Sequence, residues 1–79
     1  MKSLVELIIK ALSDHPDQAY VTEVSGESVS VLEVHVASED IGKVIGKEGR
    51  IASAIRTIVK SAAAKQGKKV TVEIITPDK

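Results

Sequence analysis

The most informative segment of this 79-residue chain is Ile41-Gly42-Lys43-Val44-Ile45-Gly46-Lys47-Glu48-Gly49-Arg50-Ile51. Gly46 and Gly49 enclose two polar residues, and glycine permits a tight turn that side chains would block. Such a turn can bring its backbone amides directly against a sugar-phosphate backbone. A helix that starts at Arg50 would point its free N–H groups and the positive end of its dipole at the same place. Three cations accompany the turn: Lys43, Lys47 and Arg50.

Other glycine motifs do not fit this segment. A phosphate-binding Walker loop has four residues between its glycines, followed by Gly-Lys-Ser/Thr, whereas here three residues separate Gly42 from Gly46 and Glu48 follows Lys47. A dinucleotide-binding fingerprint requires G-x-G-x-x-G directly after a strand. The spacing of Gly42 and Gly46 does spell G-x-x-x-G, but no apolar 20-residue segment surrounds it, so membrane helix dimerisation is unsupported. A plain turn between two helices remains the alternative interpretation.

Strands are expected on both sides of this segment. Residues 19–25 and 29–36 are rich in β-branched side chains and are separated by Gly26-Glu27, which predicts an antiparallel hairpin. A helix is expected from Arg50 until Gly67 ends it, followed by a strand over residues 70–74. Before the glycines, Ser38 is expected to cap a short helix with acids in its first turn.

The N-terminal residues predict an amphipathic helix that stops before Pro16. Ser3 and Glu6 have the spacing of a capping box. The expected core face has i, i+3, i+4 spacing and consists of Leu4, Leu7, Ile8, Ala11 and Leu12. Val5 and Ile9 lie outside that stripe, so we expect them to contact something beyond the domain's own core.

The resulting element order is α-β-β-α-α-β. We expect an α+β fold in which three helices cover one face of a three-stranded sheet. The chain is expected to form one domain over residues 1–79, with a core over about residues 4–75 and a frayed tail over residues 76–79.

Composition narrows the possible functions. Cysteine is absent, and Tyr20 is the single aromatic residue, which argues against an RNA-recognition motif because that class stacks bases on several rings. Neither His15 nor His35 has the spacing of a metal ligand, and no catalytic triad or carboxylate pair is evident. We therefore expect no enzyme activity, no metal and no cofactor. The N-terminus shows no signal peptide or membrane span, so a cytoplasmic location is expected without membrane insertion.

Charge is strongly polarised although the formal net charge is zero. Residues 1–40 carry two lysines and eight acids, a local charge of −6, whereas residues 41–69 carry eight basic residues and one acid, a local charge of +7. A local positive field of this kind can serve a nucleic acid, and solvated helix faces are the simpler alternative.

The segment from Val44 to Ile51 resembles, position by position, the signature of the KH family, a helix ending in V-I-G-x-x-G followed by a second helix. The element order resembles the bacterial, type II arrangement. From Leu4 to about Ile75, the chain looks like the small stand-alone bacterial members of the family. The resemblance implies single-stranded RNA binding, as an RNA chaperone or post-transcriptional regulator. It also implies a homodimer, or a heterodimer with a larger KH-domain protein, that acts in cell division, cell shape and cell-wall biogenesis.

The same resemblance implies residue roles. The loop from Gly46 to Gly49, including Lys47 and Glu48, would clamp about four unpaired nucleotides. Bases would rest on Ile45 and Ile51. Phosphates would be contacted by Lys47 and Arg50, with Lys43 as a helper, and Lys68 and Lys69 would flank the groove. Glu48 departs from the basic or neutral residues usual in the family, so we expect it to face solvent.

Two further possibilities follow from the residues themselves. The helix from Arg50 has an apolar arc wider than a core-facing helix needs, which favours a protein-interaction or dimerisation module in which RNA binding is secondary. Single-stranded DNA is also a chemically close ligand. With only two or three phosphate contacts expected, the affinity of one domain should be modest, and dimerisation would join two weak sites.

Overall fold

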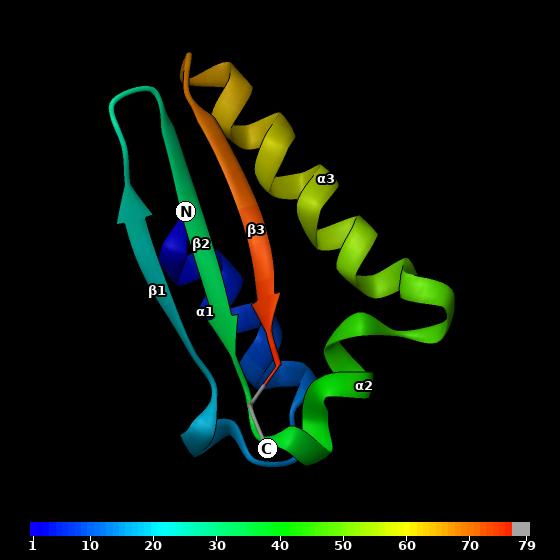
Figure 1. The fold of residues 1–79 in the computed structure, drawn as a ribbon. Helices are drawn as coiled ribbons and strands as arrows, with labels where there is room; N and C mark the ends of the chain where they lie inside the picture. Colours follow the sequence, from blue (N-terminus) through cyan, green and yellow to red (C-terminus); the bar gives the residue numbers. More distant parts are fainter. Residues whose placement is uncertain (77–79) are drawn as a thin grey trace.

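The computed structural model describes residues 1–76 and confirms the α+β class. Figure 1 shows the elements in chain order: α1 (Lys2–Leu12), β1 (Tyr20–Ser25), β2 (Val29–His35), α2 (Ile41–Ile45), α3 (Arg50–Lys65) and β3 (Lys69–Ile75). Three short 3-10 turns join them: η1 (Pro16–Gln18), η2 (Ser38–Asp40) and η3 (Lys47–Gly49). Apart from Thr76, the tail expected over residues 76–79 lies outside the described residues.

The three strands form one mixed sheet in the order β1-β2-β3. β1 pairs antiparallel with β2, with Tyr20 opposite His35, which confirms the predicted hairpin. β3 pairs parallel with β2, with Val72 opposite Leu32. A parallel pair needs a long crossover connection, and α2 and α3 provide it. The glycine segment therefore lies within the crossover.

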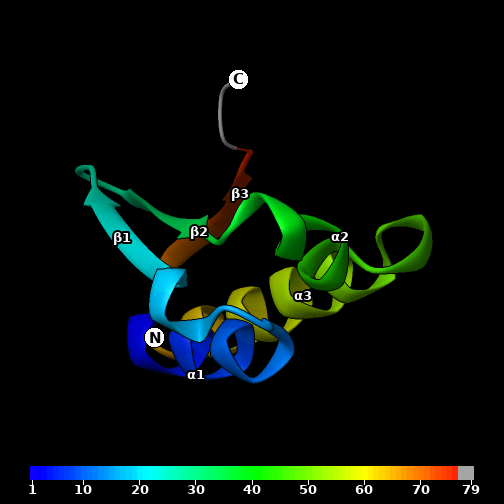
Figure 2. The ribbon, with the colours of Figure 1, turned by 90° about the horizontal axis from the view of Figure 1, so that it is seen from below.

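Helices cover one face of the sheet, and Figure 2 shows α1 and α3 together on that side. α1 packs on β1, α3 packs on β3, and α2 packs mainly against the N-terminal half of α3. The core between the two layers is aliphatic, as expected from the composition. Its largest fully buried apolar side chains are Val5, Ile9, Leu32, Val34, Val44 and Val59.

The predicted core face of α1 is wrong for Leu4, Leu7 and Ala11, whereas Ile8 and Leu12 do pack against the core. Val5 and Ile9 are completely buried, whereas Leu4 is 41% exposed and Leu7 is 68% exposed. Both sides of this helix are apolar, so periodicity alone did not identify the side that faces the sheet. β-Branched Val5 and Ile9 lie in the core, and Leu4 and Leu7 are left on the outside.

Two predicted caps are also wrong. α1 starts at Lys2 without a side-chain cap, and the Glu6 Oε2 atom instead accepts a hydrogen bond from the Val21 backbone N–H at 3.1 Å. Ser38 lies inside η2, where its hydroxyl faces Glu39 rather than a helix end. The C-terminal cap of α3 is confirmed: Gly67 has φ 69°, and the Lys68 N–H donates to the Ala63 carbonyl at 2.9 Å.

Candidate nucleic-acid interface

The loop between α2 and α3 makes its turn with three residues at positive φ. These are Gly46 (φ 78°), Glu48 (φ 57°) and Gly49 (φ 76°). The Gly46 N–H donates to the Gly42 carbonyl at 2.8 Å and closes α2, and the Gly49 N–H donates to the Gly46 carbonyl at 3.2 Å. The left-handed conformation of Glu48 costs about 1–2 kcal/mol for a residue with a side chain. The loop therefore holds Glu48 in a backbone conformation that glycine adopts more easily than a residue with a side chain.

The two loop glycines are required for different reasons. A Cβ on Gly46 would lie 2.6 Å from the Ile51 side chain, so this position is closed by packing. A Cβ on Gly49 would meet no atom within 4 Å, so the backbone there is bare and open. Gly49 is also the N-cap of α3, and no side chain caps this helix end. The Gly49 and Arg50 N–H groups donate to the Gly46 and Lys47 carbonyls, so an anion that approaches Gly49 would meet the positive end of the α3 dipole rather than these two amides.

Charged side chains at the loop are exposed. Glu48 is directed toward solvent, as expected, with 69% of its side chain accessible. Its Oε1 atom lies 3.2 Å from an amino group of Arg50, whose side chain is 79% exposed. Lys47 is exposed as well, and no carboxylate within residues 1–76 forms an ion pair with it. An incoming phosphate would therefore meet Lys47 directly and would compete with Glu48 for Arg50.

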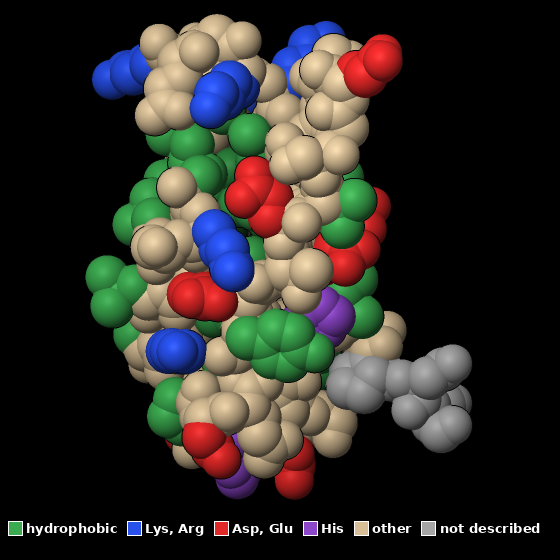
Figure 3. Space-filling model, turned by 90° about the vertical axis from the view of Figure 1, so that its left-hand side faces the viewer, with side chains coloured by type: hydrophobic (Ala, Val, Ile, Leu, Met, Phe, Trp, Pro, Cys, Tyr) green, Lys and Arg blue, Asp and Glu red, His purple; other side chains and the backbone are tan. Residues whose placement is uncertain are grey.

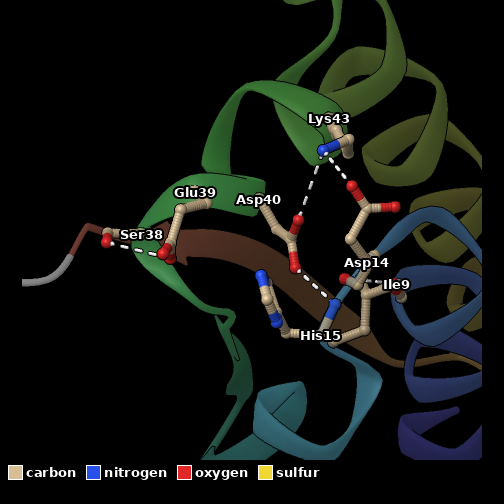
Figure 4. A network of polar contacts seen from close by, with 8 residues as sticks. Ile9, Asp14, His15, Ser38, Glu39, Asp40 and Lys43 are labelled. Atoms are coloured by element: carbon tan, nitrogen blue, oxygen red, sulfur yellow. Dashed lines mark hydrogen bonds and ion pairs between the residues drawn. The ribbon is translucent and has the colours of Figure 1, made fainter.

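Lys43 is placed elsewhere than the sequence predicts. Figure 4 shows its side chain directed back toward Asp14 and Asp40, with Nζ 2.7 Å from Asp14 Oδ2 and 3.5 Å from Asp40 Oδ1. The hydrogen bond to Asp14 is the main cause that raises the pKa of Lys43 above its ordinary value. Lys43 thus joins α2 to the segment after α1, and it is not a free cation beside the loop.

Asp40 is the buried charged residue of this network. Burial by itself would raise its pKa, but hydrogen bonds from the backbone N–H groups of His15 and Asp14, together with Lys43, hold the pKa below its ordinary value. The His15 N–H donates to Asp40 Oδ2 at 2.9 Å. The ionised carboxylate therefore ties the start of α2 to the N-terminal part of the chain.

The two isoleucines expected to support bases are half-buried. Ile45 ends α2 next to the loop, and Ile51 packs against Gly46. Because helical residues are about 100° apart, Ile51 lies about 140° around α3 from Arg56. Ile51 therefore packs beneath the loop at Gly46. Other residues of α3, such as Arg56, lie on the side that faces β3.

Lys68 and Lys69 are not brought to the loop. They follow the C-terminal end of α3, and this 16-residue helix is about 24 Å long. There they line a hollow of about 700 Å³ together with the β1–β2 turn. Lysine and arginine side chains gather at this end of the molecule, at the top of Figure 3. Their position is on the turn between α3 and β3, and a flanking contact with RNA there stays a prediction.

Arg56 is a candidate that motif reasoning missed. Its Nε atom donates a hydrogen bond to the backbone carbonyl of Val72 at 3.2 Å, so the side chain bridges α3 and β3. Arg56 directly follows the buried Ile55, and its position at the margin of the core-facing stripe was the one available signal. The partner is a backbone atom 16 positions away, which no side-chain pattern reveals.

Other kinds of site are not indicated within residues 1–76. That part of the chain contains no cluster of histidine, aspartate or glutamate side chains that could hold a metal ion. None of its helices is both long and apolar enough to cross a membrane.

Comparison with known proteins places the chain in a family. Residues 2–74 match the family model described as KhpA/KhpB, KH domain. The RNA-binding protein KhpA of Clostridium perfringens is 61% identical over 95% of this chain and all of the relative. The KhpA proteins of Aquifex aeolicus and Chlamydia trachomatis are 48% and 44% identical, covering 95% of this chain and 95% and 96% of their own lengths. No solved structure gives a significant match.

Proposed function

Since the chain belongs to the KhpA/KhpB family of KH-domain proteins, we propose that it binds single-stranded RNA through the loop from Gly46 to Gly49 and that it catalyses no reaction. The observation that carries this proposal is the bare backbone at Gly49 in front of the uncapped N-terminus of α3. An open backbone and a positive helix end favour a phosphodiester backbone, because the first permits close approach and the second interacts with negative charge without reading a base.

We assign roles according to position. The Lys47 ammonium and the positive end of α3 hold phosphates against the open loop backbone, and Arg50 joins them when it leaves Glu48. Ile45 offers an apolar edge for a base, and Ile51 keeps the loop in place. Lys43 and Asp40 fasten α2 beneath the loop rather than contacting RNA. With two or three phosphate contacts, the logarithm of affinity should fall with the logarithm of salt concentration with a slope between about −1.4 and −2.1.

The decisive test replaces Lys47 and Glu48 together by aspartate and measures binding to a fluorescein-labelled, unstructured RNA by fluorescence anisotropy. The double variant should fold, because both side chains are exposed, and should lose RNA binding. The matched control replaces Lys68 alone by aspartate, which changes the net charge by the same two units at the far end of α3. If the loop variant binds as well as the parent, the loop does not form the RNA site. Matched DNA oligonucleotides in competition would report the preference for RNA.

A second candidate function is dimerisation, and the outward apolar surface of the two covering helices favours it. Leu4 and Leu7 on α1 and Ile58 on α3 are 41%, 68% and 48% exposed, although both helices pack on the same face of the sheet. Exposed apolar side chains mark an interaction site when they form one contiguous patch, and all three lie on the helical layer of the fold. We propose that a second copy of this chain covers them, or a KhpB-like protein with its own KH domain.

Replacing Leu7 and Ile58 by lysine tests the dimer. Analytical ultracentrifugation should report a monomer for this variant and a dimer for the parent, and Val24→Lys on the open face of the sheet is the exposed apolar control. A parent chain that sediments as a monomer would contradict self-association. Purification from a bacterial lysate, with and without RNase, would then report a KhpB-like partner and bound RNA together.

The cellular role belongs to the same proposal. We infer an RNA chaperone or post-transcriptional regulator in the cytoplasm that acts in cell division and cell-envelope homeostasis. Cross-linking to RNA in living cells should recover transcripts for these processes with the parent chain and none with the loop variant. Recovery of partner protein without RNA would favour the interaction module instead.

A further inference from the structure

Arg56 occupies a position that the loop mechanism does not use. It lies six residues beyond Arg50 on α3, about 9 Å along the helix axis from the loop end. Its hydrogen bond to the Val72 carbonyl fixes the guanidinium group against β3. β3 is an edge strand that pairs with β2 alone among the described strands, so its other edge carries unpaired backbone groups.

The guanidinium group of Arg56 is not neutralised within residues 1–76. Lys43 and Arg50 each have a carboxylate partner, whereas the partner of Arg56 is a carbonyl oxygen. Its bond to Val72 uses Nε and leaves the two terminal amino groups available as hydrogen-bond donors. The residue is exposed despite this contact, so a ligand can reach it.

The geometry of the loop indicates which part of an RNA strand would reach Arg56. When phosphates lie on the loop and on the start of α3, the bases must extend away from them. On one side of the strand the fold offers α3 and the unpaired edge of β3, which is where Arg56 lies. A fixed guanidinium group in that position meets base edges, while phosphates remain at the loop.

We propose that Arg56 is the base-selecting residue of this surface and that it favours guanine, an assignment that rests on the proposed RNA binding. A guanidinium fork donates two parallel hydrogen bonds, and guanine presents two adjacent acceptors, O6 and N7, on one edge. Adenine presents one acceptor and one donor on that edge, and cytosine presents a donor, so neither accepts both bonds. Val72 holds the fork in a defined orientation, which reduces the freedom lost on binding.

The experiment measures the parent chain against eight-nucleotide uridine oligomers that carry one guanine, adenine or cytosine at successive positions. We expect one position at which guanine binds about tenfold more tightly than adenine, within the range given by a bidentate contact. Replacing that guanine by 7-deazaguanine removes the N7 acceptor and should abolish the preference. This measurement needs no protein variant, so it does not depend on a variant's folding.

Arg56→Lys is the matched variant, because it keeps the charge and removes the fork. It should lose the guanine preference while the salt dependence of uridine-oligomer binding stays unchanged. Lys60→Gln, which changes an exposed cation one turn further along α3, should keep the preference. Circular dichroism checks that each variant is folded.

Three outcomes would overturn the assignment. The first is equal affinity for all bases at every position. The second is a guanine preference that survives in Arg56→Lys or with 7-deazaguanine. The third is an equal loss for every base in Arg56→Gln with a salt slope smaller by about 0.7, which would make Arg56 a phosphate contact. A parent chain that binds none of the oligomers would contradict the proposed function itself, so the two failures are distinguishable.

Discussion

The two ends of α3 contain the same types of residue, a glycine and nearby basic side chains, but they differ in what they can bind. Each end has a glycine at positive φ, Gly49 at 76° and Gly67 at 69°, and each has basic residues within two positions. At the C-terminal end, the N–H groups of Gly67 and Lys68 return to carbonyls of the helix, so the turn satisfies itself. At the N-terminal end, no side chain caps the helix, and the positive end of its dipole lies at the open backbone of Gly49. Helix polarity, rather than glycine and lysine content, separates a binding turn from a structural one.

Gly46→Ala should have the largest effect, and it tests whether the loop end is held by packing. The added Cβ would lie 2.6 Å from Ile51, in a backbone conformation with positive φ. We expect a loss of about 2–5 kcal/mol in the free energy of unfolding, measured by urea denaturation. A loss below about 1 kcal/mol would mean that Ile51 moves aside and that the loop is adaptable.

The exchange of Lys47 and Glu48 for aspartate comes next. It should weaken RNA binding at least a hundredfold, about 2.7 kcal/mol, because two carboxylates then face the phosphate path. Lys68→Asp, which changes the net charge by the same two units, should weaken binding less than about threefold at physiological salt, since that end lies a helix length away. An equal loss of RNA affinity in the two variants would show that the two ends of α3 do not differ in RNA binding. Fluorescence anisotropy at fixed ionic strength measures both.

Gly49→Ala and Gly67→Ala form the most direct test of the comparison. A Cβ meets no atom within 4 Å at either position, and each residue has positive φ, so each variant should lose about 1–2 kcal/mol of stability. Only Gly49→Ala should also weaken RNA binding, because its methyl group covers the bare backbone. An equal affinity for RNA in both variants would argue against contact at Gly49.

Glu48→Gln should have a smaller effect of opposite sign. Removing the carboxylate releases Arg50 and lowers the negative charge beside the loop, so RNA affinity should rise about two- to threefold. Glu27→Gln in the β1–β2 turn is the control and should leave affinity unchanged. Weaker binding by Glu48→Gln would indicate that the carboxylate itself contacts the ligand.

The loss of stability when acid protonates Asp40 should be the smallest of these effects. Its pKa is lowered in the folded chain, so its ionised contacts contribute stability above its unfolded pKa of about 3.9 and lose it as pH falls through the folded pKa. Melting temperatures measured by circular dichroism should therefore fall below about pH 4. Asp40→Asn should be less stable at pH 7 and less sensitive to acid. NMR spectra should show the Gly49 signal changing before the Gly67 signal, because Asp40 and Lys43 fasten the loop end.

The features that sequence predicted well are those determined by a residue and its immediate neighbours. Gly46, Gly49 and Gly67 mark turns because their backbone conformations disfavour side chains, and these conformations are present. The solvent-facing position of Glu48 follows from its own charge beside an anion site. The α+β class follows from alternating strands and amphipathic helices, which are also local patterns.

The features that were missed depend on distant partners. Lys43 pairs with Asp14, 29 positions away, and Glu6 bonds the Val21 backbone, 15 positions away. Val5 and Ile9 face inward because of the strands above them, although the opposite side of α1 is just as apolar. Arg56 donates a hydrogen bond to a backbone carbonyl, a group that every residue has, so the sequence does not indicate which residue is its partner.

The parallel pairing of β2 and β3 also has a consequence for the order of folding. The loop from Gly46 to Gly49 lies in the connection between these strands, so all of its residues leave the ribosome before β3 does. Until β3 pairs with β2, α3 lacks the strand on which it packs, and Arg56 lacks Val72. A growing chain would thus carry the complete loop motif before the fold around it is closed. Under the proposed function, we expect the chain to bind RNA only after the final strand docks.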